Sequence, residues 1–307
     1  MSRRALPSPA DDLITIQDFV RYALTQFIEA QLVFGHGTSD PLAEAIFLVC
    51  EALHLRSEHF ELLPNARLTR AERDRVLRLV EARVRTRKPA AYLLHRAYIR
   101  GVPFYVDERV IVPRSYLGEL LGTDLVGGEQ GLIDDPAAVG RVLDLCTGSG
   151  CLAILACDTF PNARIDATDI SEEALQVAAR NVSEHGLDDR ITLLRGDLFE
   201  AVGDALYDVI LANPPYVDAE AMRRLPPEYE FEPKVALHGG PDGLEVVRRI
   251  LDEAGAHLSP QGGLLCEIGR GRDKLEQSYP ETPFLWLDTA ESSGEVFWLT
   301  SAALDSA

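Results

Sequence analysis

The segment Tyr207-Asp208-Val209-Ile210-Leu211-Ala212, followed by Asn213-Pro214-Pro215-Tyr216, decides the fold class of this sequence. Its first six residues form a short apolar run that is typical of a buried strand in a parallel sheet. Pro214 and Pro215 cannot continue a central strand, so the chain must leave the sheet there. Asn213 and Tyr216 are therefore expected at the carboxyl end of a strand, where open α/β sheets bind ligands. A plain strand end followed by a turn would explain the same residues.

Strand and helix patterns alternate from Gly140 onward, which predicts parallel pairing through right-handed crossovers. The helices expected between the strands include one over 151–158 and one opened by Ser171. Two last apolar runs have little helix between them and are expected to close the sheet as an antiparallel hairpin. The predicted strands are 141–145, 165–169, 191–194, 207–212 and 262–268, and the two closing runs are 284–287 and 295–299.

A glycine-containing turn, Thr147-Gly148-Ser149-Gly150, follows the first predicted strand. Gly-x-Gly is part of the Gly-x-Gly-x-x-Gly loop that holds a dinucleotide pyrophosphate at a helix N-terminus. Ala153 stands in the place of the third glycine, a substitution that is sometimes tolerated. Asp144 lies in the strand just before the turn, and its carboxylate would repel a pyrophosphate. A ligand that carries ammonium and sulfonium charges suits this loop better.

Two more carboxylates follow at the ends of the next two strands. Asp169 is placed where a carboxylate can accept both hydroxyl groups of a ribose, and Asp197 could accept from an adenine amino group. Each carboxylate alone is commonly a cap or turn residue. Three of them at successive strand ends, beside a glycine turn, predict a nucleoside site. The implied ligand is S-adenosylmethionine.

The length and net charge of the chain limit its number of domains and the classes of partner that it can bind. A chain of 307 residues allows about two domains, and its net charge of −19 argues against a general binder of duplex DNA. A basic protein is the better partner. The five cysteines form no Cys-x-x-Cys pair and are expected to be reduced packing residues. The stretch Met1–Asp12 has no apolar core and no run reaches membrane-spanning length, so the sequence predicts a cytoplasmic protein without membrane contact.

The front of the chain, from residue 13 to about 93, is predicted to be helical. Thr15, Asp40 before Pro41, and Thr69 with Glu72 are the expected N-terminal caps of three helices. The β-forming residues from Ala97 to Val112, with a turn at Gly101, predict a hairpin. A helix at 116–121 and a loop at 127–138 follow. The predicted domains are 1–95, a helical substrate-recognition domain; 96–139, the hairpin and linker; and 140–307, the catalytic domain.

A basic strip lies at residues 67–100, which hold eleven Arg or Lys and three Asp or Glu. The strip therefore carries +8, which leaves −27 for the rest of the chain. A solvated helical face with local ion pairs explains it. Contact with RNA, or with the acidic face of a partner, is the functional alternative.

Together these residues resemble the class I methyltransferases that modify planar amide or amino nitrogens. The later segments are similar to glutamine N5-methyltransferases that act on proteins of translation, and the front half is most similar to the branch that modifies large-subunit ribosomal protein L-three. Cys146, in a place where glycine is common, is associated with that branch; Glu230-Phe231 depart from the more polar or basic pair expected. The segments that carry the resemblance are 144–150, Asp169, Asp197, 213–216, 232–233, 236–237 and 239–244, and at the front 34–38, 89–93 and 104–114.

The resemblance implies an α/β fold with a Rossmann-like, seven-stranded, mostly parallel sheet. It implies S-adenosyl-L-methionine as cofactor, S-adenosyl-L-homocysteine as product, and no metal. Asn213 and Pro214 would each accept one amide N–H of the target glutamine, and Tyr216 would pack against the amide. Pro215, Arg114 and Glu232 are further substrate candidates, the last two with a structural salt bridge as the alternative. The implied cofactor residues are Asp144, Thr147, Gly148, Ser149, Gly150, Asp169, Asp197, Leu198 and Asn213.

Three other functions stay open. The same chemistry could act on a peptide-chain release factor. Asn-Pro-Pro-Tyr also serves enzymes that methylate N6 of a flipped adenine, although the charge of −19 opposes a nucleic-acid substrate. A protein that binds S-adenosylmethionine without catalysis is the third possibility, and the intact Asn213 and Tyr216 oppose it.

Overall fold

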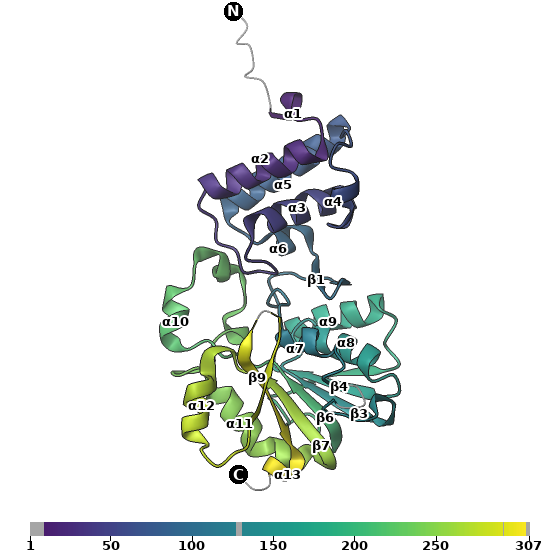
Figure 1. The fold of residues 1–307 in the computed structure, drawn as a ribbon, viewed down its shortest axis with the longest axis vertical. Coiled ribbons are helices and arrows are strands. Elements are labelled where there is room, and N and C mark those ends of the chain that lie inside the picture. The colour runs from purple at the N-terminus through teal and green to yellow at the C-terminus, as the bar shows by residue number, and fades with distance from the viewer. Residues whose placement is uncertain (1–8, 127–130, 291, 305–307) are drawn as a thin grey trace, which may run out of the picture. The chain divides into compact units, whose positions relative to one another are not determined.

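The structure, a computed structural model, describes residues 9–126, 131–290 and 292–304. The chain divides into two compact units, one formed by residues 1–96 with 226–231 and the other by 97–225 with 232–307 (Figure 1). The first part of Met1–Asp12 and positions 127–130 of the predicted loop lie outside the described residues. A recognition role for 1–95 and a linker role for 96–139 stay predictions.

The first unit is helical, and the three predicted caps are confirmed. Thr15 and Asp18 form a capping box, as do Thr69 and Glu72, and the Asp40 side chain accepts from the Leu42 amide. The apolar faces of these helices meet in one core that contains Phe19 and Phe27, both without exposed surface. The helices are α1 (Pro9–Asp12), α2 (Ile16–Glu29), α3 (Pro41–Ala52), α4 (His59–Leu62), α5 (Arg70–Thr86) and α6 (Ala90–Leu94).

Several cations of the basic strip are bound inside this unit. Arg83 has no exposed surface; its Nε lies 2.6 Å from Oε1 of Glu44, and its other nitrogens donate to the carbonyl oxygens of Arg87 and Val33. Burial raises the pKa of Glu44, although the Arg83 charge opposes that rise. Further strip cations pair with a carboxylate or a carbonyl oxygen within the unit, namely Arg70, Arg73, Arg75 and Arg87. Local pairing therefore accounts for much of the strip.

The short helical turn Pro227–Phe231 completes the first unit. Glu228 is fully buried; its Oε1 accepts from the Val33 amide at 2.9 Å and lies 2.6 Å from Nη2 of Arg87. A Cβ at Gly35, which has φ +146°, would meet the Tyr229 hydroxyl at 2.7 Å. The Phe-Gly-His-Gly-Thr segment, residues 34–38, thus packs closely against the turn Pro227–Phe231. Phe231, one of the two residues that depart from the expected pair, has the Lys88 ammonium 5.6 Å from its ring centroid.

The second unit opens with a hairpin that is shorter than predicted. Its strands are β1 (Ala97–Ile99) and β2 (Val102–Phe104), and α7 (Tyr116–Leu120) follows. The expectation that β structure continues to Val112 is wrong. Backbone amides in this stretch donate to side chains and not to a neighbouring strand. The Asn181 side chain accepts from the Tyr105 amide, and the Glu232 side chain accepts from the Val112 amide. The chain from 105 to 115 is therefore irregular although much of it is buried.

The seven-stranded sheet predicted for the second unit is confirmed. Its order is β5-β4-β3-β6-β7-β9-β8; the strands from β5 to β7 are parallel, and β9 is antiparallel to both of its neighbours, β7 and β8. The fifth strand begins four residues before its predicted start. The strands are β3 (Arg141–Leu145), β4 (Arg164–Asp169), β5 (Ile191–Arg195), β6 (Tyr207–Ala212), β7 (Leu258–Glu267), β8 (Leu285–Asp288) and β9 (Ser293–Thr300).

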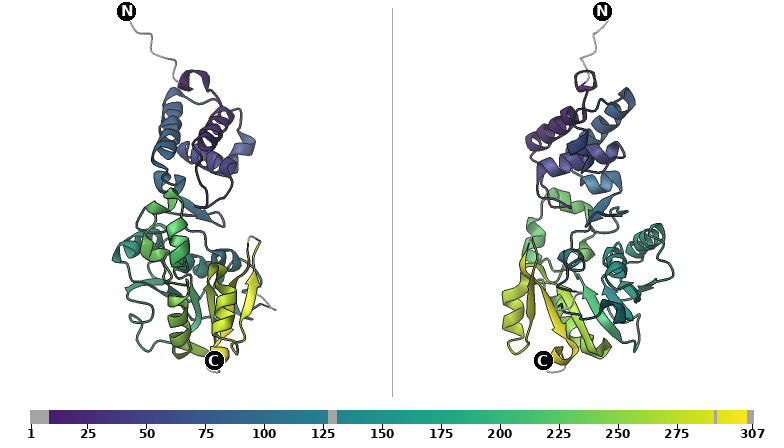
Figure 2. Two further views of the ribbon diagram at one scale, coloured as in Figure 1. Left: turned by 90° about the vertical axis from the view of Figure 1, so that its left-hand side faces the viewer. Right: turned by 45° about the vertical axis from the view of Figure 1, so that its right-hand side comes forward.

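Helices cover both faces of this sheet (Figures 1 and 2). Alternate strand residues point to opposite faces, so Val142 joins the core under α8 while Leu143 joins the core under α11. Each fully buried aliphatic side chain contributes about 1.5–3 kcal/mol to the free energy of folding. The helices are α8 (Cys151–Thr159), α9 (Glu172–Glu184), α10 (Ala219–Arg224), α11 (Glu245–Ala254), α12 (Arg272–Ser278) and α13 (Ser301–Leu304).

The strand order reverses between β3 and β6. From β3 the chain continues to β4 on one side, whereas β6 continues to β7 on the other. The loops after β3 and β6 therefore diverge and leave a crevice at the carboxyl ends of the strands, which is where open α/β sheets bind ligands. Asp144 to Gly150 and Asn213 to Tyr216 occupy these two loops and the last residues of β3.

Candidate functional site

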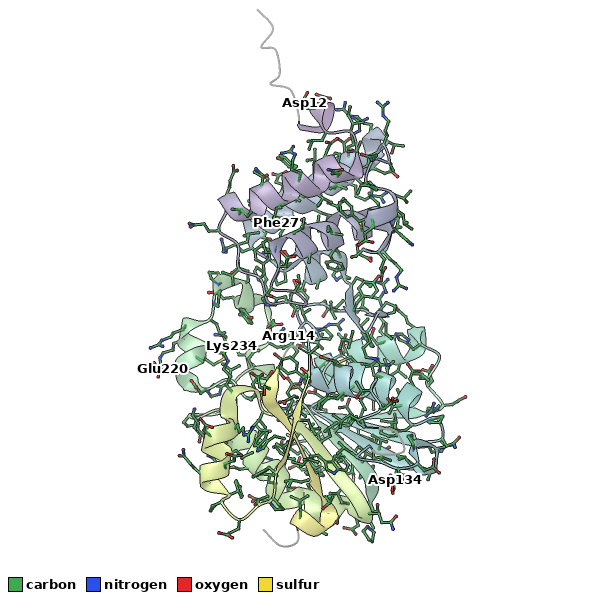
Figure 3. All side chains as sticks on the ribbon, in the orientation of Figure 1. Asp12, Phe27, Arg114, Asp134, Glu220 and Lys234 are labelled. Atoms are coloured by element: carbon green, nitrogen blue, oxygen red, sulfur yellow. The ribbon has the colours of Figure 1, made fainter. Side chains whose placement is uncertain are left out.

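A cavity of about 560 Å³ lies at the carboxyl ends of β3, β4, β5 and β6, within the range of small-ligand sites. Six of the residues predicted from the sequence line it, and the segment after β2 and the stretch 233–238 supply further walls. Lys234, labelled in Figure 3, belongs to the second of these. The predicted residues in the lining are Gly148, Asp169, Asp197, Leu198, Asn213 and Pro215.

Asp169 lies at the end of β4. One carboxylate oxygen accepts from the Gly148 amide at 2.9 Å, and the other accepts from the Ser171 amide at 2.8 Å. Burial raises the pKa of Asp169, while these two donors lower it. Because a carboxylate oxygen can accept more than one hydrogen bond, each oxygen keeps capacity for a ligand hydroxyl.

Asp197 and Leu198 follow β5. The Oδ2 atom of Asp197 accepts from Arg249 at 2.9 Å, and within the described chain no group donates to its Oδ1. Leu198 is buried and has a positive φ of 52°, an uncommon conformation for a leucine. The turn therefore presents a carboxylate edge and an apolar side chain to the same cavity.

Asp144 has a different position from that expected of a ligand contact. It has no exposed surface and does not line the cavity. Its Oδ2 accepts from the Thr147 hydroxyl at 2.5 Å and from the Ala153 amide at 3.1 Å, whereas its Oδ1 is bonded to no described residue. Burial raises the pKa of Asp144 to about 7. Asp144 thus fastens the glycine turn to the first turn of α8, and its contact with a ligand ammonium stays a prediction.

Asp144→Asn is expected to flatten the pH dependence of stability between about pH 4 and pH 7. The folded state holds a proton on Asp144 that the unfolded chain, with an aspartate pKa near 3.9, has already released. Wild-type stability therefore falls as pH rises through this window, by about 1.4 kcal/mol for each unit of pKa difference. Urea unfolding at pH 5 and pH 8 measures it. Asp158→Asn, at an exposed position in the last turn of α8, is the control; equal slopes in wild type and Asp144→Asn would contradict the expectation.

The loop after β6 brings Asn213 and Pro215 to the cavity, whereas Pro214 is buried beside them. No described residue forms a hydrogen bond with the Asn213 side chain, so its amide remains available to a ligand. The Tyr216 hydroxyl donates to Oε1 of Glu267 at 2.8 Å, and Tyr216 does not line the cavity. The prediction that Tyr216 packs against the substrate amide finds no support in this position.

Arg114 and Glu232 are bonded to each other. Two guanidinium nitrogens of Arg114 (labelled in Figure 3) donate to the two Glu232 oxygens at 2.5 and 2.7 Å. Glu232 is 3% exposed and also accepts from the Val112 amide. Since neither residue lines the cavity, their geometry matches the structural salt bridge that was the alternative to substrate contact.

Comparison with known proteins identifies the family. Residues 131–225 match the family described as "Methyltransferase small domain". The chain is 64% identical to the ribosomal protein uL3 glutamine methyltransferase of Bradyrhizobium diazoefficiens, over 96% of this chain and 93% of that protein. It is 49% identical to the protein of the same name from Bordetella pertussis, over 96% and 97%. The chain belongs to the ribosomal protein uL3 glutamine methyltransferase family.

Two solved structures also resemble the chain, at lower sequence identity. The catalytic domain of hMettl16, in complex with MAT2A 3′UTR hairpin 6, superimposes with a TM-score of 0.46 at 18% identity and covers 74% of this chain and 79% of that one. The ribosomal protein L11 methylase of Lactobacillus delbrueckii has a TM-score of 0.36 at 25% identity, over 52% and 67%.

The cavity of this family member fits the family's cofactor, S-adenosylmethionine. Carboxylates at the ends of β4 and β5 can accept from ribose and adenine donors, and the buried Thr168 hydroxyl in the lining has no partner among the described residues. Cys146 also lines the cavity, with a positive φ of 57°, a conformation that glycine adopts more easily. Thr147, Ser149 and Gly150 lie in the turn but outside the lining, so their cofactor roles stay predictions.

Sequence reasoning missed Glu267, Arg109 and Asn181. Glu267 ends an apolar strand and binds Tyr216. Arg109 lines the cavity while Asp107 holds its guanidinium at 2.6 Å. Asn181 has no exposed surface and bonds the backbone of both Ser149 and Tyr105, which joins the glycine turn to the cavity wall. For Glu267 the sequence did offer a signal, since a charged residue inside an otherwise apolar predicted strand often has a specific role.

Within the described ranges, no helix is long and apolar enough to cross a membrane, and no group of three or more His, Cys, Asp or Glu could hold a metal ion. The five cysteines are unpaired, and burial raises the pKa of the Cys50 thiol to about 11. A protonated thiol in an apolar setting behaves as a packing residue.

Proposed function

We propose that this chain transfers a methyl group from S-adenosylmethionine to the side-chain amide N5 of a glutamine in ribosomal protein uL3. The observation that carries the proposal is the cavity, where Asn213, after β6, lies with Asp169 at the end of β4 and Asp197 after β5. An identity of 64% to a protein of that name supports the proposal. A basic protein substrate also suits a chain with a net charge of −19.

Methyl transfer to a glutamine amide requires orientation of the amide nitrogen more than it requires acid–base groups. A glutamine amide nitrogen is a weak nucleophile because its lone pair is delocalised into the carbonyl. The cofactor supplies a methyl group on a sulfonium and leaves as S-adenosylhomocysteine, while the amide nitrogen loses one proton. The Asn213 side-chain oxygen and the Pro214 carbonyl each accept one amide N–H, which aims the lone pair at the methyl and favours the positive charge that develops on nitrogen.

The parts of the chain would divide the work. The first unit selects the protein partner, and the second unit holds the cofactor and the glutamine. Contact of the basic strip with RNA is a further part of the proposal, limited to the cations that are exposed on the unit, such as Arg67, Arg78 and Arg85. The site of action is the cytoplasm, where ribosomal proteins are made.

Transfer of labelled methyl to three purified acceptors tests the proposal. The acceptors are uL3 from cells that lack the modification, an unmethylated release factor, and total RNA. Label on a glutamine of uL3 alone is the expected result. Label on the release factor would leave the chemistry intact but change the substrate. Label only in RNA would mean that Asn213 holds a base and that the protein-substrate proposal is wrong.

A further inference from the structure

We propose that Glu267 is a positioning residue for methyl transfer: through Tyr216 it holds the loop that carries Asn213 and Pro214. The inference rests on the proposed function, because that function gives the loop its role. Glu267 touches neither the cavity nor the reacting atoms, so it would act only through the phenol that it binds.

Glu267 lies beside the start of this loop. It is the last residue of β7, which runs parallel to β6 with Cys266 opposite Ala212. The loop begins at the next residue of β6, so the Glu267 side chain stands where the loop leaves the sheet. It is 1% exposed, and burial raises its pKa.

Three donors surround this buried carboxylate. Its Oε1 accepts from the Tyr216 hydroxyl at 2.8 Å, and its Oε2 accepts from the Ser115 hydroxyl at 2.7 Å and the Tyr116 amide at 2.9 Å. A carboxylate removed from water is very unfavourable unless such bonds satisfy it. Ser115 also caps α7, so its bond to Oε2 ties the Glu267 carboxylate to that helix, while Oε1 binds Tyr216.

The Tyr216 ring is held as firmly as its hydroxyl. Gly269 has a positive φ of 53°, and a Cβ at that position would lie 2.8 Å from two ring carbons of Tyr216. Burial and the Glu267 charge raise the pKa of Tyr216 well above its usual value, so the phenol remains a neutral donor. The protein therefore contacts both the hydroxyl and the ring of this side chain.

The loop transmits this position to Asn213 because it has little freedom of its own. Pro214 and Pro215 each have φ fixed by their rings. Beyond Tyr216, the Val217 amide donates to the Leu237 carbonyl at 2.8 Å and the Val217 carbonyl accepts from Gly239 at 2.9 Å. A shift of Tyr216 must therefore move the acceptors on its N-terminal side, and a misplacement of about 1 Å can cost about 100-fold in rate.

The test compares Tyr216→Phe and Glu267→Gln with Tyr207→Phe. Tyr207 also donates a hydroxyl hydrogen bond of 2.8 Å to a carboxylate, that of Asp166, but lies at the other end of β6 and outside the cavity. Each of the first two variants is expected to lower kcat for uL3 about 10-fold or more, with the Kd for S-adenosylmethionine changed less than about twofold. Tyr207→Phe should keep the wild-type kcat. The double variant should be no slower than the slower single one, because both remove the same bond.

Hydrogen exchange of the Val217 and Gly239 amides supplies a readout that needs no acceptor protein. Exchange should be faster in Tyr216→Phe and Glu267→Gln and unchanged in Tyr207→Phe. Tyr216→Phe keeps the ring and its packing on Gly269, so it serves if Glu267→Gln does not fold. Wild-type kcat and wild-type exchange in Tyr216→Phe would overturn the inference. If the wild-type protein methylates none of the three acceptors, the proposed function fails, and the exchange experiment still decides whether Glu267 holds the loop.

Discussion

Asn213→Ala lowers the rate of methyl transfer to uL3 by about 100- to 1,000-fold while the protein stays folded: this is the largest effect that we expect at the reacting centre. The variant removes one of two acceptors that hold the target amide. Without it the amide can rotate, and the charge that develops on nitrogen loses a dipole directed at it. The Asn213 side chain is bonded to no described residue, so its removal leaves no buried partner unsatisfied.

The measurement is kcat for unmethylated uL3, together with the Kd for S-adenosylhomocysteine and the melting temperature. We expect kcat to fall while the melting temperature changes little. Asn162→Ala removes an exposed asparagine whose amide donates to the Ala137 carbonyl, and it serves as the control. Near-normal turnover in Asn213→Ala would show that this side chain does not orient the substrate.

The sequence predicted the sheet well because each strand is an apolar run bounded by turn residues. All seven strands lie where this pattern placed them, and β7 alone begins clearly earlier. The hairpin prediction extended too far because Val106, Val110 and Val112 are β-forming and buried, yet side chains such as Asn181 and Glu232 bind that backbone. Those partners lie 76 and 120 residues away in the chain, so no local pattern could reveal them.

The sequence predicted which residues of the candidate site lie near strand ends, but not which of them line the cavity. Asp169, Asp197 and Asn213 lie at or just after the carboxyl ends of β4, β5 and β6, and strand-end position is readable from sequence. The positions of Asp144 and Tyr216 outside the cavity lining were not readable, since they depend on bonds to the Thr147 and Glu267 side chains. A carboxylate next to a glycine turn reads as a ligand contact whether it faces the cavity or supports the turn from behind.

The two units of the chain differ in net charge. Residues 1–96 and 226–231 contain 14 Arg or Lys and 14 Asp or Glu, whereas residues 97–225 and 232–307 contain 16 and 35. The first unit is therefore neutral, and the second unit carries the whole −19. Long-range attraction for a basic substrate would arise from the second unit, which also contains the cavity. Selection by the first unit would then depend on shape and local contacts.

Asp169→Ala is expected to weaken the binding of S-adenosylmethionine about 100- to 1,000-fold. The substitution removes two acceptors for the ribose hydroxyls, and hydrogen bonds to a charged group contribute about 1.5–3 kcal/mol each. It also leaves the Gly148 and Ser171 amides without the carboxylate that orders them, so the glycine turn loses its side-chain connection to β4 and keeps only the backbone bond from Thr147 to Thr168. The Kd for S-adenosylhomocysteine should rise by a similar factor, because the product keeps the ribose.

Calorimetric titration with both nucleosides measures this effect, and Asp166→Ala is the matched control. Asp166 lies three residues earlier on the same strand, bonds Arg141 and Tyr207, and does not line the cavity. Its loss should lower stability without a change in nucleoside affinity. An Asp169→Ala protein that binds both nucleosides within about twofold of wild type would rule out the ribose role. Equal weakening in the two variants would mean that general damage to β4, and not the lost ribose contacts, sets the affinity.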